Sequence, residues 1–396
     1  MHQDHETKLQ TLLERGVENI FPNREFLEEK LKLGKPLTIY CGYDPTGPTL
    51  HIGHAITLMK LRDFQELGHK VIMLIGDFTA LIGDPTDKGA ARVRQTREQV
   101  LENCKLYQKQ ASSILKFDGE NPAELRFNND WLGKLSFAEV IDLASHFTVQ
   151  QMLERDMFEK RMAEEKPIYL HEFLYPLMQG YDSVAMDVDG EVGGNDQTFN
   201  MLAGRHLMKD LNGKEKFVVT GKLLVDSVGK KMGKSEGNMI AMSDSPEDMF
   251  GKVMRWSDEM IVPGFEICTR VPMHEVKEVE EAMKSGVNPR DFKLNLAYHV
   301  TQMFLGDEAA RQGRDNFAAV IQNSEKPAEI TELKPSAYDI VTVLVEAGFV
   351  ESRGEARRQI EGGGVKINDE KVESLEAQTK AGDIIQKGKR FFVKVI

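Results

Sequence analysis

Two apolar segments, each followed by a glycine-rich loop and a helical pattern, constrain the fold of this chain most strongly. Residues 36–41 and 70–75 are apolar and rich in β-branched residues, which is typical of buried strands. The loops GYDPTGPTL and GDFTALIGDPTDKG follow them, and helices are expected over about residues 51–67 and 92–115. This repetition predicts an α/β protein with a Rossmann-like, doubly wound parallel sheet.

Other segments extend this pattern. Apolar residues recur at three- and four-residue spacing over residues 9–20, which predicts an N-terminal helix. A further core strand is expected at residues 217–219, and mostly helical structure over residues 136–185 and 246–322. An all-α region should therefore follow the sheet.

The length of 396 residues predicts two or three domains. The polar stretch EKPAEITELKP, with two prolines, indicates a seam near residues 323–335. We expect an α/β domain over residues 1–240, an all-α domain over 241–325, a linker over 326–335 and a small α+β domain over 336–396. The last 62 residues hold ten basic and ten acidic residues, so the net charge of −12 lies in the rest of the chain.

Composition excludes several classes of protein. An acidic chain is no basic nucleic-acid coat, so any contact with nucleic acid must use a local patch. The three cysteines lie far apart, so neither a disulfide framework nor a cysteine zinc site is expected, and a reducing cytoplasm fits. We expect no metal site, no signal peptide and no membrane span.

The sequence His51-Ile52-Gly53-His54 stands at an expected helix start, directly after a strand and a turn. A helix N-terminus has unpaired amide donors and a partial positive charge, which suit a phosphate group. His51 and His54 share one face of the first turn, and Gly53 lets a flat ligand approach the backbone. Taken alone, the two histidines fit an exposed helix cap equally well.

A second motif, Lys231-Met232-Gly233-Lys234-Ser235, lies in a glycine-rich loop. Two lysines three residues apart can clamp a polyphosphate and neutralise the charge of a leaving phosphate. The alternative is a solvated basic loop, which is the usual role of such segments. The two motifs together favour a nucleotide site far more than either does alone.

These two motifs resemble the HIGH and KMSKS signatures of class I aminoacyl-tRNA synthetases. Gly233 stands where the second signature has serine, but both lysines are in place. The chain is most similar to the tyrosyl-tRNA synthetases, over nearly its whole length. The resemblance implies activation of L-tyrosine with ATP and Mg²⁺, transfer to tRNA(Tyr), and a homodimer. Residues 1–240 would then be the catalytic domain, with a helical insertion at the dimer interface, and residues 241–325 would bind the anticodon arm.

The resemblance also implies a tyrosine-binding set. Tyr40 and Asp182 would contact the phenolic hydroxyl of tyrosine, and Asp84 its α-ammonium group. Tyr175, Gln179 and Asp182 are spaced to share one face of a helix, although an ordinary amphipathic helix has the same spacing. The full set is Tyr40, Thr79, Asp84, Tyr175, Gln179, Asp182 and Gln197.

For ATP, the resemblance implies contacts around the ribose and the phosphates. Cys41, His54 and Thr57 would lie along the ribose, although a plain buried thiol is the more usual fate of a strand cysteine. The ATP set is Cys41, Gly42, Asp44, Gly53, Thr57, Gly194, Asp196 and Lys234. Catalytic contacts with the γ-phosphate and pyrophosphate would come from Thr46, His51, His54, Lys88, Arg92, Lys231 and Lys234. Thr198 stands where the family usually has tryptophan.

Selection of tyrosine is expected to depend on Tyr40 and Asp182. A buried hydroxyl and a buried acceptor would be left unpaired by phenylalanine, which makes that ligand unfavourable. An apolar indole site for tryptophan would not need this pair.

The last domain resembles the S-four RNA-binding domain. A short helix would present Arg353, Arg357 and Arg358, and a strand after the triple glycine would present Lys366. Such a patch suits an RNA backbone. On charge alone, a solvated helix neutralised by nearby glutamates fits equally well.

Two other functions compete with a tyrosine–tRNA ligase. A nucleotidyl transferase that activates another carboxylate would need no RNA module. A synthetase-like protein that only binds RNA would not need intact His51, His54, Lys231, Lys234 and Asp84.

Overall fold

The computed structural model describes residues 2–84, 95–226, 229, 232, 239–322, 330–350, 352–372, 374–388 and 391–396. The chain forms two compact units, Met1–Ala310 and Arg311–Ile396. The expected boundary at residue 240 therefore falls inside the first unit. The expected linker, 326–335, falls within the range of the second, and residues 323–329 lie outside the described residues.

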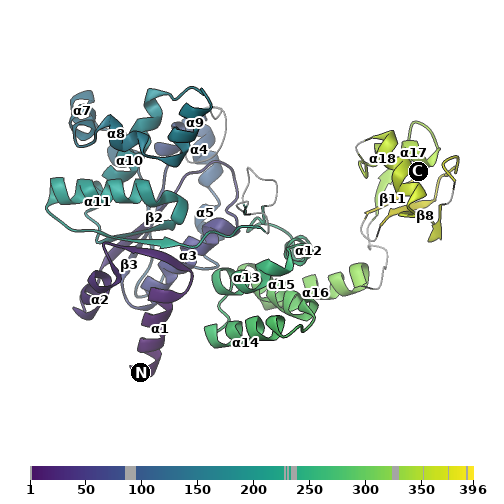
Figure 1. Cartoon of the computed structure of the whole chain (residues 1–396), viewed down its shortest axis with the longest axis horizontal. Helices are drawn as coiled ribbons and strands as arrows, with labels where there is room; N and C mark the ends of the chain where they lie inside the picture. The colour runs from purple at the N-terminus through teal and green to yellow at the C-terminus, as the bar shows by residue number, and fades with distance from the viewer. Residues whose placement is uncertain are drawn as a thin grey trace. The chain divides into compact units, whose positions relative to one another are not determined.

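A six-stranded sheet in the order β1-β6-β5-β2-β3-β4 forms the centre of the first unit (Figure 1). Strands β2 to β6 are parallel, and β1 joins the edge antiparallel to β6. The doubly wound parallel sheet expected from the sequence is confirmed. The strands are β1 (Val17–Phe21), β2 (Thr38–Tyr43), β3 (Lys70–Ile75), β4 (Glu124–Phe127), β5 (Gly190–Gly194) and β6 (Phe217–Gly221).

The direction of winding reverses between β2 and β5. From β2 the chain proceeds outward to β3 and β4, whereas β5 and β6 lie on the other side of β2. The loops at the carboxyl ends of β2 and β5 therefore diverge, which leaves a place for a ligand between them.

Helices cover both faces of the sheet. Helix α3 (Ile52–Glu66) packs on β2, β3 and β5, while α11 (Thr198–Asn212) packs on β5 and β6 and against α10 (Leu170–Met186). Figure 1 shows α10 and α11 on one side of the sheet and α3 on the other. The other elements around the sheet are α1 (His2–Glu14), α2 (Arg24–Lys32), η1 (Thr79–Leu81), α4 (Arg97–Cys104), α5 (Tyr107–Ala111), α6 (Asn129–Leu132), α7 (Phe137–Ser145), α8 (Val149–Leu153), α9 (Asp156–Ala163) and η2 (Asn195–Gln197).

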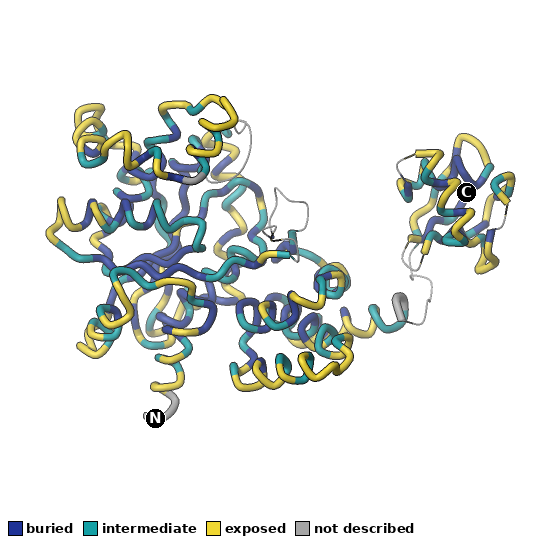
Figure 2. The backbone as a smooth tube through the Cα atoms, viewed as in Figure 1, coloured by how far each residue is buried: buried dark blue, intermediate teal, exposed yellow. Residues whose placement is uncertain are grey.

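The sheet is buried and closely packed. Its central strands are dark blue in Figure 2, and Ile39, Tyr40, Phe217 and Val218 are fully buried. Gly190 on β5 shows how close the packing is, because a Cβ atom there would lie 2.1 Å from the Phe217 ring. A larger residue at position 190 would push β5 and β6 apart.

Helices complete the first unit after β6. Helix α12 (Pro246–Met254) packs against α15 (Pro289–Leu305), and α13 (Ile261–Cys268) packs against α14 (Met273–Lys284), α15 and also α3. The remaining elements are η4 (Asp258–Met260), α16 (Asp307–Asn316) and a π-helical turn, Phe317–Gln322. The expected all-α segment is thus present, with a direct contact to the sheet domain through α13.

Two expected elements were wrong. The single helix expected over about residues 92–115 is instead two short helices, α4 and α5, and the second ends at Ala111. The pattern over residues 9–20 predicted a single helix, but α1 ends at Glu14 and β1 begins at Val17. Gly16 has a φ of +63°, a left-handed conformation that stops the helix. Val17 and Ile20 lie instead in the strand that pairs with β6, so their apolar spacing does not reflect a helical period.

The second unit contains a five-stranded sheet in the order β7-β11-β10-β8-β9. Helices α17 (Ile340–Glu346) and α18 (Arg353–Glu361) share a core with the sheet, formed by residues such as Leu344, Ile360 and Ile385. The strands are β7 (Thr331–Leu333), β8 (Val365–Ile367), β9 (Glu370–Lys371), β10 (Ile384–Lys387) and β11 (Phe391–Val395).

Candidate active site

Polar side chains gather at the carboxyl edge of the sheet, where the winding reverses. Asp44 follows β2, Thr79 follows β3, Asn128 follows β4 and Gln197 follows β5. Because the carboxyl ends of parallel strands meet at one edge, residues distant in sequence come together there. This edge is the candidate active site.

The start of α3 presents two histidine rings side by side. His51 is the N-cap, and its Nδ1 accepts a hydrogen bond of 3.1 Å from the Gly53 amide. The His51 amide in turn donates to Nδ1 of His54, also at 3.1 Å, and the rings stack at 3.8 Å. Since each Nδ1 accepts a hydrogen bond, the hydrogen of each neutral ring is on Nε2. The unpaired amides expected at this helix start are instead paired within the protein, because those of His51, Ile52, Gly53 and His54 all donate to protein acceptors. The two ring Nε2 donors are therefore the groups here that suit phosphate oxygens.

The segment after β6 lies against this helix start. The Ile52 amide donates to Ile240 O at 3.0 Å, and the Met242 amide donates to Leu50 O at 2.8 Å. A Cβ at Gly53 would lie 3.7 Å from Met232 O. The flanks of the lysine motif are therefore beside His51 and His54. Lys231 and Lys234 themselves lie outside the described residues, as do Lys88 and Arg92.

Asp44 connects two of the residues expected to bind tyrosine. Its Oδ2 accepts a hydrogen bond of 2.9 Å from the Tyr175 hydroxyl, and its Oδ1 accepts one of 2.7 Å from Thr79 Oγ1. Position 76 must be glycine here, because a Cβ there would lie 1.9 Å from Asp44 Oδ1. The structure thus places Asp44, which the sequence assigned to ATP, among the tyrosine set.

Asp182 is buried on α10 with its own donors. Trp131 Nε1 donates to Oδ1 at 2.7 Å, and Asn128 Nδ2 donates to Oδ2 at 3.2 Å. Asn128 Nδ2 also donates to Thr79 Oγ1 at 3.1 Å, which ties Asp182 to the Asp44 group. Burial outweighs these donors and raises the pKa of Asp182 well above its ordinary value. Sequence reasoning missed Asn128 and Trp131, which no spacing links to Asp182.

Tyr40 lies behind Asp182 in the core. Its hydroxyl is 2.9 Å from Ser183 Oγ and 3.4 Å from Gln179 O. Tyr40 and Asp182 were expected to act as a pair, but in the structure each has other hydrogen-bond partners. Gln179 Nε2 donates to Glu191 Oε1 at 3.1 Å, so Gln179 also lies in this group.

Two further expected residues meet at the end of β5. Gln197 Nε2 donates to Asp84 Oδ2 at 2.6 Å, and Asn200 Nδ2 donates to Gln197 Oε1 at 2.9 Å. Gly194 allows Asp196 to fold back, because a Cβ at position 194 would lie 2.5 Å from Asp196 Oδ1.

The residues expected to contact the ATP ribose lie close to His54, near the start of α3. The Tyr43 hydroxyl is 3.0 Å from Thr57 Oγ1, which donates to His54 O at 2.9 Å. Cys41 lies next to them, and burial raises the pKa of its thiol to about 12. A thiol that stays protonated is a poor nucleophile, so nucleophilic chemistry is not expected of Cys41. Of the other expected residues, Gly42 stands in β2 and Thr46 in the turn after it.

Comparison with known proteins identifies the family. A family model described as "tRNA synthetases class I (W and Y)" matches residues 32–322, and one described as "Tyrosine--tRNA ligase SYY-like C-terminal domain" matches residues 321–394. The tyrosine–tRNA ligase of Thermotoga maritima is 43% identical over 97% of this chain and 96% of its own. That of Haemophilus influenzae is 44% identical over 97% and 95%. The chain belongs to the tyrosine–tRNA ligases of class I.

Solved structures of this family have the same fold. The C-terminally truncated mitochondrial tyrosyl-tRNA synthetase of Coccidioides posadasii is 28% identical, with a TM-score of 0.62 over 78% of this chain and 91% of that one. The Archaeoglobus fulgidus enzyme, solved with L-tyrosine, is 24% identical with a TM-score of 0.61 over 78% and 100%, which supports the fold.

In the synthetase's second unit, the expected basic residues are exposed. Arg353, Arg357 and Arg358 stand on α18, and Lys366 stands on β8. Lys371 on β9 was missed, although it is paired directly with Lys366 across the strands. The signal for it was Asn368-Asp369, a two-residue turn with both residues at positive φ. Two like charges directly opposite each other are unfavourable unless an anion lies over them.

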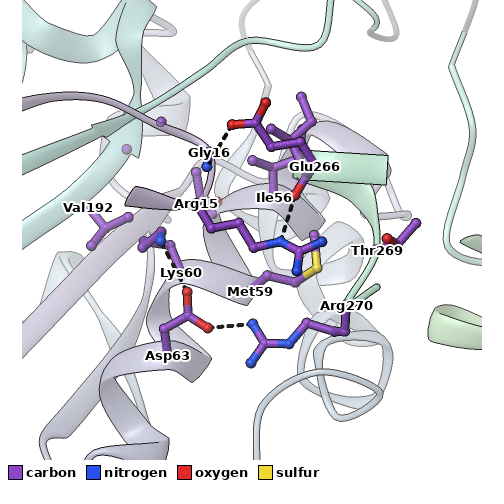
Figure 3. Close-up of a pocket in the computed structure, with 14 residues that line it drawn as sticks. Arg15, Gly16, Ile56, Met59, Lys60, Asp63, Val192, Glu266, Thr269 and Arg270 are labelled. Atoms are coloured by element: carbon purple, nitrogen blue, oxygen red, sulfur yellow. Dashed lines mark hydrogen bonds and ion pairs between the residues drawn. The ribbon is translucent and has the colours of Figure 1, made fainter. Parts of the chain in front are cut away.

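A small pocket near the synthetase's candidate site is lined by residues that hold α13 against the sheet domain, and it is not a ligand site. Thr57 and Gly193 line it, together with a charged group between α1, α3 and α13 (Figure 3). Arg15 donates to the main-chain oxygens of Phe265, Glu266 and Val271, and Asp63 pairs with Lys60 and Arg270. These cations are already paired with protein groups, so they fix α13 to the sheet domain instead of binding an anion.

The described residues contain no cluster of three or more histidine, cysteine, aspartate or glutamate side chains placed to hold a metal ion. None of the helices in the described part of the chain is long and apolar enough to span a membrane.

We predict that Asp182→Asn makes the enzyme's stability less sensitive to pH. The raised pKa means that folded Asp182 keeps its proton where the unfolded chain, with a pKa near 3.8, has lost it. Native stability therefore falls as pH rises from 3.8 through the folded pKa, by about 1.4 kcal/mol for each pH unit in that window. Asparagine does not titrate, so the unfolding free energy of Asp182→Asn minus that of the wild type should grow over this range and then level off. Urea unfolding at several pH values measures it. A difference independent of pH would contradict the prediction.

Proposed function

We propose that this site activates L-tyrosine with ATP to tyrosyl-adenylate and pyrophosphate, and then transfers tyrosine to the 3′-terminal ribose of tRNA(Tyr). The observation that carries the proposal is the meeting of two groups at one sheet edge. Asp182 on α10 and Tyr40 on β2 form the proposed phenol-binding group. The start of α3, which carries His51 and His54, lies at the same edge of the sheet.

In the first step, a carboxylate oxygen of tyrosine attacks the α-phosphorus of ATP, and the bond to pyrophosphate breaks. The step needs no protein nucleophile. Holding the reactants in line and stabilising charge on the phosphates account for catalysis. In the second step, a ribose hydroxyl of tRNA attacks the activated carbonyl carbon, and AMP leaves.

For tyrosine, Asp182 accepts from the ligand's phenol and Tyr40 donates to it. Tyr175 and Asp84 receive the ammonium group and Gln179 lies on the carboxylate side, with Thr79 and Gln197 next to them. Asp44 belongs to this group by its contacts, since it holds the hydroxyls of Tyr175 and Thr79 in place. A negatively charged surrounding favours the ammonium group over a neutral analogue.

For ATP, His51 and His54 donate through Nε2 to the β- and γ-phosphates, with Thr46 nearby. Gly53, Gly42 and Gly194 leave room for the nucleotide, and Cys41, Thr57 and Asp196 contact the ribose. Lys88, Arg92, Lys231 and Lys234 would neutralise pyrophosphate. Mg²⁺ would arrive bound to the phosphates of ATP as part of the substrate.

The first test is ATP–pyrophosphate exchange with tyrosine, phenylalanine or tryptophan, without tRNA. We expect exchange with tyrosine alone, because only tyrosine pairs with both Asp182 and Tyr40. Exchange with tryptophan would keep the fold and the chemistry but overturn the proposed amino-acid site. No exchange with any of the three would favour a protein that only binds RNA, or another carboxylate substrate.

The second unit is proposed to bind tRNA through Arg353, Arg357, Arg358 and Lys366, and Lys371 extends this patch. Residues 241–325 would contact the anticodon arm.

Variants in the two units should affect different steps. His54→Ala removes a phosphate donor and should lower the exchange rate about 100-fold while tRNA binding persists. Arg357→Ala with Arg358→Ala should leave exchange unchanged, weaken tRNA binding and lower the slope of log affinity against log salt by about 2. Exchange assays and tRNA binding at several salt concentrations measure both. Loss of both activities in either variant would contradict this division of labour.

A homodimer is proposed from an exposed apolar surface on the helices before β5. Phe137 and Leu170 have 80% and 84% of their surfaces exposed, and Ile141 and Val149 are also exposed. Helices α7 and α8, which carry three of these four residues, are largely yellow in Figure 2. Helix α7 contacts α10, and large apolar residues exposed on adjoining elements are typical of a protein interface.

We predict that Phe137→Asp with Ile141→Asp yields a monomer in sedimentation velocity experiments, because a charge cannot be buried unpaired in the interface. Leu33→Asp, at a similarly exposed leucine that caps α2, is the matched control and should remain a dimer. A double variant that stays dimeric, or a monomeric wild type, would place the interface elsewhere or remove it.

A cytoplasmic location belongs to the same proposal. All three cysteines are free thiols, as a reducing compartment requires, and tRNA charging serves translation.

A further inference from the structure

A buried ion pair lies behind the tyrosine-binding residues. Lys216, just before β6, has a side chain with no solvent exposure, and it pairs with Glu191 on β5, which is 2% exposed. Burial lowers the pKa of Lys216, while the charge of Glu191 opposes that effect. Removing two charges from water is costly, and apolar residues of similar size are often as stabilising. Stability alone is therefore a weak explanation for the pair.

Both partners are linked by hydrogen bonds to residues assigned to amino-acid binding, Lys216 through Ser183 and Glu191 directly. Lys216 Nζ donates to Ser183 Oγ at 2.8 Å, and Ser183 Oγ is 2.9 Å from the Tyr40 hydroxyl. On the other side, Glu191 Oε1 accepts from Gln179 Nε2 at 3.1 Å. The site thus has a continuous buried connection from Lys216 to Tyr40 and Gln179.

The helix behind the pair leaves room for it. A Cβ atom at Gly204 on α11 would lie 2.7 Å from Lys216 Nζ and 2.9 Å from Ser183 Oγ. The Lys216 ammonium also lies 5.8 Å from the centroid of the Tyr40 ring. The packing of α11 on β6 therefore fixes where the ammonium group can be.

The chemistry of the ammonium group sets the direction of the hydrogen bonds. Lysine can only donate, so Ser183 Oγ accepts from Lys216. Ser183 is fully buried, and its oxygen has two hydrogen-bond partners among the described residues, Lys216 and Tyr40. The hydroxyl hydrogen of Ser183 therefore has a hydrogen-bond acceptor only if it points to the hydroxyl oxygen of Tyr40. Tyr40 then keeps its own hydrogen, for which Gln179 O at 3.4 Å and the Glu191 carboxylate are acceptors within the protein.

We propose that Lys216 is a positioning residue for amino-acid selection, which acts through Ser183 on the Tyr40 hydroxyl. The chain of donors from Lys216 to Ser183 to Tyr40 leaves the Tyr40 hydrogen available for the phenol oxygen of the substrate. The substrate's own hydroxyl hydrogen then goes to Asp182. The inference rests on the proposed roles of Tyr40, Gln179 and Asp182.

The test uses two variants of the full chain that break the connection at different points. Lys216→Met with Glu191→Gln removes both charges, so no unpaired buried charge is left, and it keeps an acceptor for Gln179. Ser183→Ala leaves the ion pair in place and removes only the link to Tyr40. Lys214→Met is the matched control, because Lys214 is two residues away and bonds instead to Asp187 and Asp189.

The readouts are the KM values for tyrosine and ATP in pyrophosphate exchange, and inhibition by phenylalanine as a competitor of tyrosine. Phenylalanine lacks the hydroxyl, so a loss of positioning should not weaken its binding. We expect both variants to raise the KM for tyrosine about tenfold or more, with the KM for ATP and the phenylalanine inhibition constant unchanged. The control should behave as the wild type.

Two results would overturn the proposal. Parallel weakening of tyrosine and phenylalanine would show that the pair only supports the fold of the site. An unchanged KM for tyrosine in Ser183→Ala would show that Lys216 does not act through Ser183. A wild-type enzyme without tyrosine-dependent exchange would instead refute the proposed function, which keeps the two failures distinct.

Discussion

The parallel pairing of β2 with β5 is the interaction on which the site depends. Ile39 is paired with Gly190 and Tyr40 with Glu191, although about 150 residues separate the two strands. This pairing creates the point where the winding reverses, and it brings Tyr40 to the ion pair of Glu191 and Lys216. It requires close packing, since Gly190 leaves no space for a methyl group beside Phe217. The loops that carry Asp44 and Gln197 diverge from this one junction.

The two sides of the candidate site differ in their charged and polar groups. The side proposed for the amino acid contains carboxyl groups. Asp44 is half-buried and Asp182 and Glu191 are buried, and each accepts hydrogen bonds from side chains on other elements. The side proposed for the phosphates instead has histidine ring donors at the start of α3. Under the proposed function, an acidic protein would bind a polyanion locally, because the ring donors and the helix dipole lie at the start of α3 while these carboxyl groups are paired with other side chains.

Sequence reasoning succeeded where a short pattern and a structural element coincide. β3 begins and ends where its apolar run does, and His51 and His54 share a helix turn because their spacing demands it. Prediction from the sequence failed where contacts between distant parts of the chain determine the local structure. The helical spacing of Val17 and Ile20 was equally compatible with an edge strand once Gly16 ended the helix.

The burial of charged residues in the core could not be predicted from the sequence either. Lys216 and Glu191 are expected at the surface from their residue types alone, and only the packing of β5, β6 and α11 shows them buried together. Asn128 and Trp131 follow a strand that the sequence did not reveal, so their contact with Asp182 could not be expected. The hydrogen-bond partners of a site residue therefore depend on three-dimensional packing, which a short sequence motif does not determine.

The stacked histidines have a consequence for the proposed catalysis. Each Nδ1 accepts a hydrogen bond from the backbone, so the cap of α3 fixes the orientation of both rings. Donors that are already oriented need no reorganisation when charge develops on a leaving phosphate. Under the proposed function, the contacts that begin the helix would therefore also prepare the site for the departure of pyrophosphate.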